Sequence, residues 1–121
     1  MPYIHDSVLD AALDYIDTNC TALHICSQLP ATLVEANTTY SLGNKTPPTI
    51  GTPTDGDASG RKIVVSAISD GSVTASGTAS HWALVSGTEL LAAEELATPQ
   101  VVTSGNVFTL AELDVTLPDP V

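Results

Sequence analysis

The chain has 121 residues, of which 43% are hydrophobic and only 14% are charged. This length fits one domain over residues 1–121 that buries roughly two thirds of its unfolded surface. Fourteen acidic residues stand against three basic ones, which gives a formal net charge of −11. A surface of that charge repels phosphate, so we expect no binding to nucleic acid.

The first predicted element is an amphipathic helix over residues 7–18. Ser7 and Asp10 have the spacing of a capping box, which marks a helix start. Apolar residues recur at three- and four-residue spacing on one side, namely Leu9, Ala12, Leu13 and Ile16. The aspartates on the opposite side are Asp10, Asp14 and Asp17. We expect the apolar side to pack on the body of the protein and the acidic side to be solvated.

The short apolar run 22–26 predicts a buried strand. His24 lies within it, and no second metal-binding residue follows at a usable spacing, so we expect a hydrogen-bonded packing residue. Cys20 and Cys26 are expected to be free thiols, because the N-terminus lacks the pattern of a secretory signal. No apolar run approaches the roughly 20 residues that a membrane-spanning helix needs. These features favour a protein made in the cytoplasm.

Two segments follow before the main β region. Residues 32–35 repeat the capping-box pattern and predict a single helical turn. Residues 43–60 are rich in Gly, Pro, Thr and Asp, which predicts an extended loop or arm able to reach a partner. Within it, residues 55–60 match the opening of a calcium-binding loop. The twelfth position would be Ser66 where a glutamate is required, so we expect no metal site.

The dipeptide Asp70-Gly71 predicts a two-residue hairpin turn between strands 61–69 and 72–79. One face of that hairpin is mostly apolar. The other face is half apolar because of Ile63, Val65 and Ala67. Such a face is covered either by a neighbouring sheet or by a second subunit, and the sequence leaves both open.

The remaining strands complete a β core over residues 61–117. Trp82 is expected in the core, since it is the single tryptophan of the chain. Residues 105–106 predict a type II′ turn that joins strands 100–104 and 107–111. From Leu113 to Leu117 apolar and polar residues alternate, which is typical of a strand buried on one face.

These elements predict a mainly β fold: a compact antiparallel β-sandwich or barrel of six to seven short strands with one N-terminal amphipathic α-helix. The sequence has no nucleophile elbow, phosphate-binding loop, dinucleotide fingerprint or HExxH zinc motif. Its three histidines are widely separated. We therefore expect no enzyme, no catalytic residue and no cofactor.

Several stretches resemble small virion proteins of tailed bacteriophages. They are residues 4–16 (IHDSVLDAALDYI), 40–45 (YSLGNK), 81–84 (HWAL), and 103–110 (TSGNVFTL) running to 118–120 (PDP). Within that group the stretches resemble capsid decoration, or cement, proteins, which bind the outside of the head after assembly and are commonly trimers. The resemblance covers nearly the whole chain. It implies a homo-oligomer whose partner is the major capsid protein on the outer capsid surface.

The charge agrees with an outer position, because an acidic protein inside a head would face packaged DNA. Two other functions remain open: a tail or head-to-tail joining subunit, and a ligand-binding β module. The interface candidates are Ile63, Val65, Ala67, Lys45, Pro47, Pro48 and Ile50.

Overall fold

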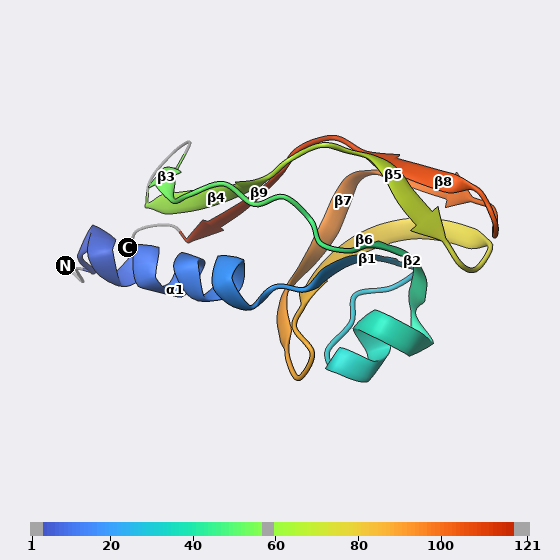
Figure 1. Ribbon diagram of the computed structural model, residues 1–121, viewed down its shortest axis with the longest axis horizontal. Helices are drawn as coiled ribbons and strands as arrows, with labels where there is room; N and C mark the ends of the chain where they lie inside the picture. The colour runs from blue at the N-terminus through green and yellow to red at the C-terminus, as the bar shows by residue number, and fades with distance from the viewer. Residues whose placement is uncertain (1–3, 57–59, 118–121) are drawn as a thin grey trace.

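The computed structural model describes residues 4–56 and 60–117 and shows a mainly β protein with an N-terminal helix (Figure 1). Its elements are α1 (Asp6–Asn19), β1 (Ala22–Cys26), η1 (Glu35–Thr39), β2 (Ser41–Lys45), β3 (Thr54–Asp55), β4 (Arg61–Val65), β5 (Ile68–Val73), β6 (Gly77–Val85), β7 (Leu90–Val102), β8 (Val107–Leu110) and β9 (Leu113–Leu117). The described strands form two antiparallel, curled sheets, ordered β7-β6-β1-β2-β5-β8 and β3-β4-β9. The predicted fold class is confirmed, with nine described strands where six or seven were expected.

Helix α1 confirms the predicted helix to within one residue at each end. It begins differently from the expectation, because the residue that caps it is His5 and not Ser7. The Nδ1 atom of His5 accepts a hydrogen bond from the backbone N–H of Ser7 at 3.0 Å, which satisfies one free amide of the first turn. In Figure 1 the helix runs beneath β4 and β9, and it contacts β4.

One hydrophobic core joins the helix to both sheets. Its fully buried members include Leu13 from α1, Leu23 and Ile25 from β1, Ile63 and Val65 from β4, and Leu84 from β6. Leu9 is buried as well, and Ile16 packs against the cluster, as the helical periodicity predicts, whereas Ala12, which was expected on the same side, is exposed. Trp82 is 3% exposed, which confirms it as a core residue.

Strand β1 lies in the middle of the larger sheet and is buried along its whole length, as predicted. Its alternate residues Ala22 and Cys26 belong to a second buried cluster, which includes Ala36 of η1. His24 is 9% exposed, and its Nδ1 atom lies 2.8 Å from the hydroxyl of Ser41. The expectation of a hydrogen-bonded packing histidine is therefore confirmed.

The helical turn predicted at residues 32–35 has its capping box. The hydroxyl of Thr32 accepts from the backbone N–H of Glu35 at 3.2 Å, and the Glu35 carboxylate accepts from the N–H of Ala31 at 2.8 Å. The turn continues further than predicted, because residues 35–39 form the π-helical segment η1. This segment covers the β1 face that carries Cys26.

The hairpin predicted at Asp70-Gly71 is wrong. Strand β5 continues through this dipeptide, with a register shift against β8 between Ile68 and Gly71, and pairs with β2 on one side and β8 on the other. Gly71 is opposite Phe108, and a Cβ atom at Gly71 would overlap the buried Phe108 ring. The glycine is therefore required for packing and not for a turn. Strand β4 pairs with β9 instead, so that Ile63 faces Val115.

The predicted loop or arm over residues 43–60 is interrupted by paired residues, namely 43–45 in β2, the bridge at Ile50 and 54–55 in β3, while residues 46–49, 51–53 and 56 have no helix or strand. Gly43 lies within β2, where a Cβ atom would overlap the backbone carbonyl oxygen of Ser72 on β5. Farther along, Ile50 forms an isolated bridge with Val65, and β3 pairs with β4. The segment is thus laid along the body by backbone pairing. The partial calcium-loop pattern at residues 55–60, where we expect no metal site, falls partly outside the described residues.

The larger sheet curls until its two edges approach one another. The chain turns near Gly105, whose φ of +89° suits glycine. The predicted pairing across that turn is wrong, because β8 pairs with β5 and not with β7. Strands β7 and β8 are therefore opposite edges of one sheet, and the Gln100 amide donates to the backbone oxygen of Thr109 between them at 2.7 Å.

Candidate interaction surfaces

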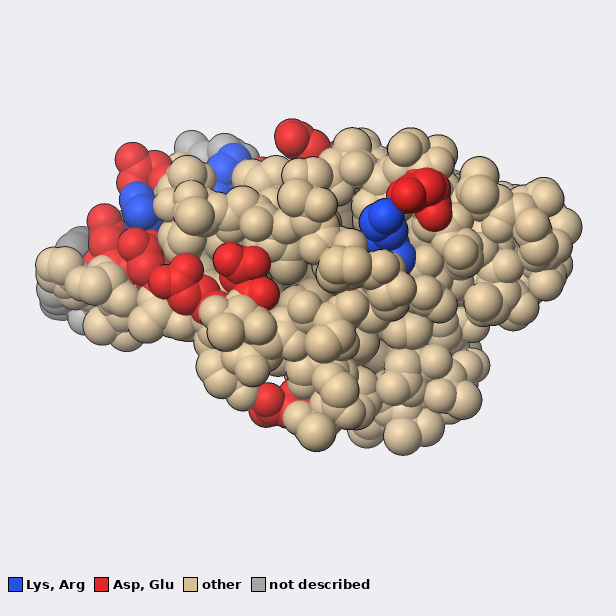
Figure 2. Space-filling model, in the orientation of Figure 1, with Lys and Arg blue, Asp and Glu red and all other residues tan. Residues whose placement is uncertain are grey.

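The surface is acidic, and its few basic side chains are engaged within the protein. Figure 2 shows acidic side chains gathered over the part of the molecule that α1 occupies in Figure 1. All three basic residues of the chain form ion pairs. The pairs are Lys45–Asp70 at 2.9 Å, Arg61–Asp10 and Arg61–Asp55 at 2.7 Å each, and Lys62–Asp114 at 3.3 Å. This arrangement offers no basic patch for phosphate.

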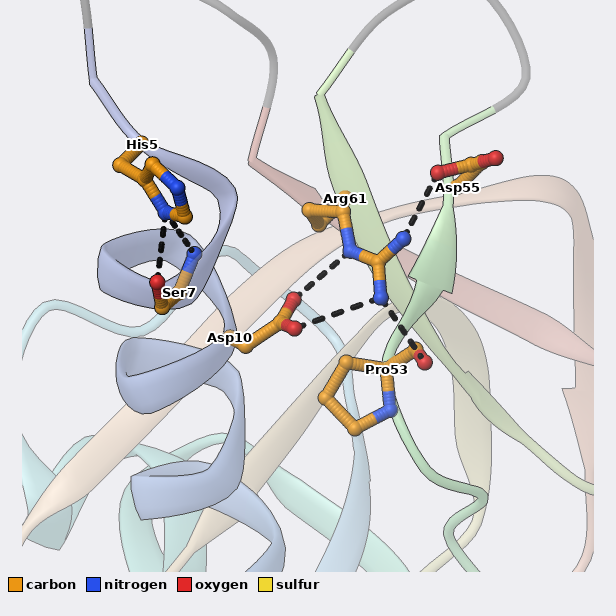
Figure 3. Close-up of polar contacts among 6 residues, drawn as sticks. All are labelled: His5, Ser7, Asp10, Pro53, Asp55 and Arg61. Carbon is orange, nitrogen blue, oxygen red and sulfur yellow. Dashed lines mark hydrogen bonds and ion pairs between the residues drawn. The ribbon is translucent and has the colours of Figure 1, made fainter.

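Arg61 connects α1 to the smaller sheet (Figure 3). Its Nε and Nη2 atoms donate to the two carboxylate oxygens of Asp10, and Nη1 donates to Asp55. Nη2 also approaches the backbone oxygen of Pro53 at 3.4 Å. The hydrogen bonds that Arg61 donates to Asp10, and to a smaller extent the one to Asp55, raise the pKa of its guanidinium above the ordinary value. Asp10 is therefore a structural ion-pair partner and not only part of a solvated face.

We expect Arg61→Ala to lower the melting temperature by several degrees, because the substitution removes a two-pronged bond between α1 and β4. Amide hydrogen exchange in residues 6–19 should become faster. The matched control is Lys62→Ala on the same strand, which removes a longer pair with Asp114. Equal changes in the two variants would show that Arg61 has no special role in holding the helix.

The structure places the seven predicted interface residues in different environments. Ile63 and Val65 are fully buried in the protein's own core, so they are not available as the interface residues that the sequence suggested. Of the two alternatives left open, the cover for these two residues comes from the same chain, because they share one buried cluster with Leu13 of α1 and with residues of the larger sheet. The others are Pro48, which is buried; Lys45 and Ile50, which are half-buried; and Pro47 and Ala67, which are exposed.

Large exposed apolar side chains occur in three separate sets that the sequence analysis missed. We call them the apolar sets. They are Ile4, Val8 and Tyr15 on or beside α1; Leu29 and Val34 around the helical turn; and Val101 and Val107 on β7 and β8. Val101 is 83% exposed. The seven-residue spacing of Val8 and Tyr15 was a usable signal, since it places both residues on one side of a helix, away from Leu9 and Leu13.

A cavity of about 350 Å³ lies where the edges of β7 and β8 approach each other. We call this place the seam. It is lined by residues 96–100 on one side and by residues 109–113 on the other. The sequence analysis missed the seam because it paired residues 100–104 with residues 107–111 directly. Pro99 was a usable signal, since proline within a strand indicates a sheet edge.

Reactive side chains do not gather into a centre in the part of the chain that the structure describes. Within residues 4–56 and 60–117, no group of three or more His, Cys, Asp or Glu side chains could hold a metal ion. Cys20 and Cys26 are free thiols that approach separate backbone oxygens, those of Ala22 and Ala36. Burial raises the pKa of the Cys26 thiol to about 11 and lowers the pKa of His24. Among the described helices, none has the length and apolar character needed to span a bilayer.

We expect the Cys26 thiol to be almost inert toward a thiol-specific reagent at pH 8, because burial disfavours the thiolate that reacts. Cys20 is half-buried and should react first. The measurement is the time course of Ellman's reagent with the native chain and with Cys20→Ala, each with and without denaturant. Fast labelling of folded Cys20→Ala would mean that β1 opens readily.

The chain was compared with protein-family models, with curated proteins and with solved structures, and none of the three comparisons found a match. No relative therefore indicates what the protein binds.

Proposed function

We propose that this protein is a capsid decoration protein that binds the outer surface of a bacteriophage head and stabilises the shell. The structural observation that carries the proposal is the occurrence of three separate apolar sets on a strongly acidic protein. Separate contact patches suit a protein that touches several neighbours at once, because linked weak contacts add avidity. The phage-like stretches supply the identity of the partner, the major capsid protein.

The charge supports a position on the outside of the head. Each of the three basic side chains is already paired with an aspartate of the same chain. Packaged DNA would meet a net charge of −11, which is unfavourable inside the shell. On the outer surface the same charge keeps the protein soluble. Binding to nucleic acid is therefore not part of the proposal.

We propose a small closed oligomer, most simply a trimer, as the decorating unit. The contact between copies cannot use Ile63 and Val65, which are buried within one chain. The apolar sets are the surfaces left for it, and closed symmetry would use one set between copies and leave the others for the shell. Light scattering of the purified chain measures the mass of this unit.

Heads that lack the protein should assemble but release their DNA at a lower temperature than complete heads, or, as salt is lowered, at a salt concentration that complete heads still withstand. The reason is that repulsion within the packaged DNA is less screened at low salt, so the shell bears more load. The measurement is DNA release from depleted heads, with and without added purified chain. Depleted heads as robust as complete ones, or a chain found only on tails, would replace the proposal with a tail or joining role.

Variants added back to depleted heads test the apolar sets. Val8→Ser, Val34→Ser and Val101→Ser each remove an exposed apolar side chain from one set. The matched control is Thr38→Ser, an equally small change at an exposed position. We expect weaker rescue from at least one of the three valine variants and full rescue from the control. Full rescue by all three valine variants would mean that the apolar sets do not hold the shell.

A further inference from the structure

The seam has two strand edges that face each other without a continuous ladder. In the described part of the chain β7 pairs with β6 and β8 pairs with β5, and each strand ends its sheet. The outer edge of such a strand presents backbone N–H and C=O groups to whatever lies beside it. Between the two edges the bond from the Gln100 side chain to the Thr109 oxygen crosses at one point.

The pairing of β7 with β6 is irregular beside the seam. Glu95 pairs with His81 and Gln100 pairs with Ala79, so residues 96–99 stand against the single residue Ser80. These four residues therefore lie outside the regular register of the β6 ladder. A bulge of this kind bends a strand and turns its backbone groups toward new partners. Residues 96–100, which include this bulge, form the β7 wall of the seam.

The chemistry of the cavity wall fits an extended peptide. Its larger apolar side chains include Leu96, Leu110 and Leu113, and its polar side chains include Thr98 and Thr109. The volume of about 350 Å³ is near the lower end for ligand sites, so the seam suits a narrow extended chain. Extended peptides commonly bind by adding a strand to a sheet edge, with main-chain hydrogen bonds and side-chain pockets on alternate residues.

The charge at the seam selects the kind of peptide. Glu112 is the charged residue among those that line the cavity, and Glu94 and Glu95 precede the β7 wall on the same strand. A second copy of this chain cannot readily supply the complementary charge, because its three basic side chains are held in ion pairs. A partner strand that carries lysine or arginine can supply it.

We propose that the seam between β7 and β8 binds an extended strand of a partner protein that carries basic side chains. The strand adds to the β7 and β8 edges, and a basic side chain pairs with Glu112. The inference concerns the seam alone and goes beyond the proposed decoration role, because it holds for any partner with such a strand.

The test uses the full chain labelled with ¹⁵N and a pool of capped seven-residue peptides. The pool has valine, threonine or leucine at odd positions and lysine at even positions. We expect the amide signals of residues 96–100 and 109–113 to shift as the pool is added, while those of α1 stay in place. A pool with glutamate at the even positions should bind at least about tenfold more weakly. A pool with methylated backbone nitrogens should also bind more weakly, because it cannot form the ladder.

Two substitutions probe the seam, and one serves as a control. Ala97→Trp fills the cavity from an exposed position on β7, and Ala67→Trp makes the same change at an exposed position between β4 and β5. We expect Ala97→Trp to abolish peptide binding and Ala67→Trp to retain it. Glu112→Gln should weaken binding several-fold without disturbing the fold, which gives a second reading if the tryptophan variant is unstable.

Three outcomes would overturn the inference. The first is that the lysine pool leaves the seam signals unmoved at millimolar concentration. The second is that the glutamate pool binds the native chain as well as the lysine pool does, or that Ala97→Trp binds the lysine pool as well as the native chain does. The third is a concentration-dependent dimer of the chain alone whose amide shifts map to residues 96–100 and 109–113, which would assign the seam to a second copy.

Discussion

Replacing Leu13 with aspartate is expected to lower the free energy of unfolding by at least about 4 kcal/mol. Leu13 has no exposed surface and lies in the cluster that joins α1 to both sheets, with Ile63 and Val65 among its members. The substitution leaves a cavity and places a carboxylate in it that the apolar neighbours cannot pair. Domains of this size are typically stable by about 5–15 kcal/mol, so the substitution removes a large share of the stability and should move unfolding to a much lower denaturant concentration.

Two further variants separate the causes in a urea or guanidinium unfolding series. Ala12→Asp adds the same charge to the same helix at an exposed position, so it should cost little. Leu13→Ala leaves the cavity without the charge and should fall between the native chain and Leu13→Asp. If Leu13→Asp unfolds at the same denaturant concentration as Ala12→Asp, α1 is not part of the core.

The elements that the sequence predicted correctly are those whose signal is local. Leu9 and Leu13 repeat with the helical period, so the buried side of α1 could be read directly. In β9, Val115 is buried while Asp114 and Thr116 are exposed, as the alternation indicates. Each pattern shows which side of one helix or strand packs on the core, so it can be recognised without knowing which segments lie beside that element.

Strand pairing could not be predicted in the same way, because it depends on segments far apart in the chain. Ile63 was paired with the wrong strand, since its partner Val115 comes from the last described strand and not from the next one. The half-apolar face was correctly identified as covered, but the sequence could not say by what. The seam was missed although its two walls are close in the chain, because β7 and β8 are the opposite edges of a curled sheet and do not pair directly.

Glycine gave the most misleading signals because it serves two physical purposes. At Gly105 the backbone has a positive φ and the chain turns, although the turn spans residues 103–106 and does not join two paired strands as the sequence predicts. At Gly43 and Gly71 the same residue sits in the middle of a strand where another group approaches closely. Composition alone cannot separate these uses, so residues 43–45 were taken for a loop and Asp70-Gly71 for a turn.

Gly71→Ala separates the two uses by experiment, and we expect it to lower the free energy of unfolding by about 2 kcal/mol or more. The new methyl group would overlap the ring of Phe108, which is 2% exposed and has little room to move. The matched control is Gly87→Ala in the turn between β6 and β7, where a Cβ atom meets no neighbour within 4 Å. That control should be neutral or slightly stabilising.

The decisive measurement repeats Gly71→Ala in a Phe108→Leu background. If overlap with the ring is the cause, the second substitution should relieve most of the cost of the first, and the double-mutant cycle should show a coupling of about 1 kcal/mol or more. If Gly71 were instead needed for a positive φ in a hairpin turn, alanine would cost the same whatever stands at position 108. An unchanged cost in the Phe108→Leu background would therefore support the hairpin turn that the sequence predicts at Asp70-Gly71.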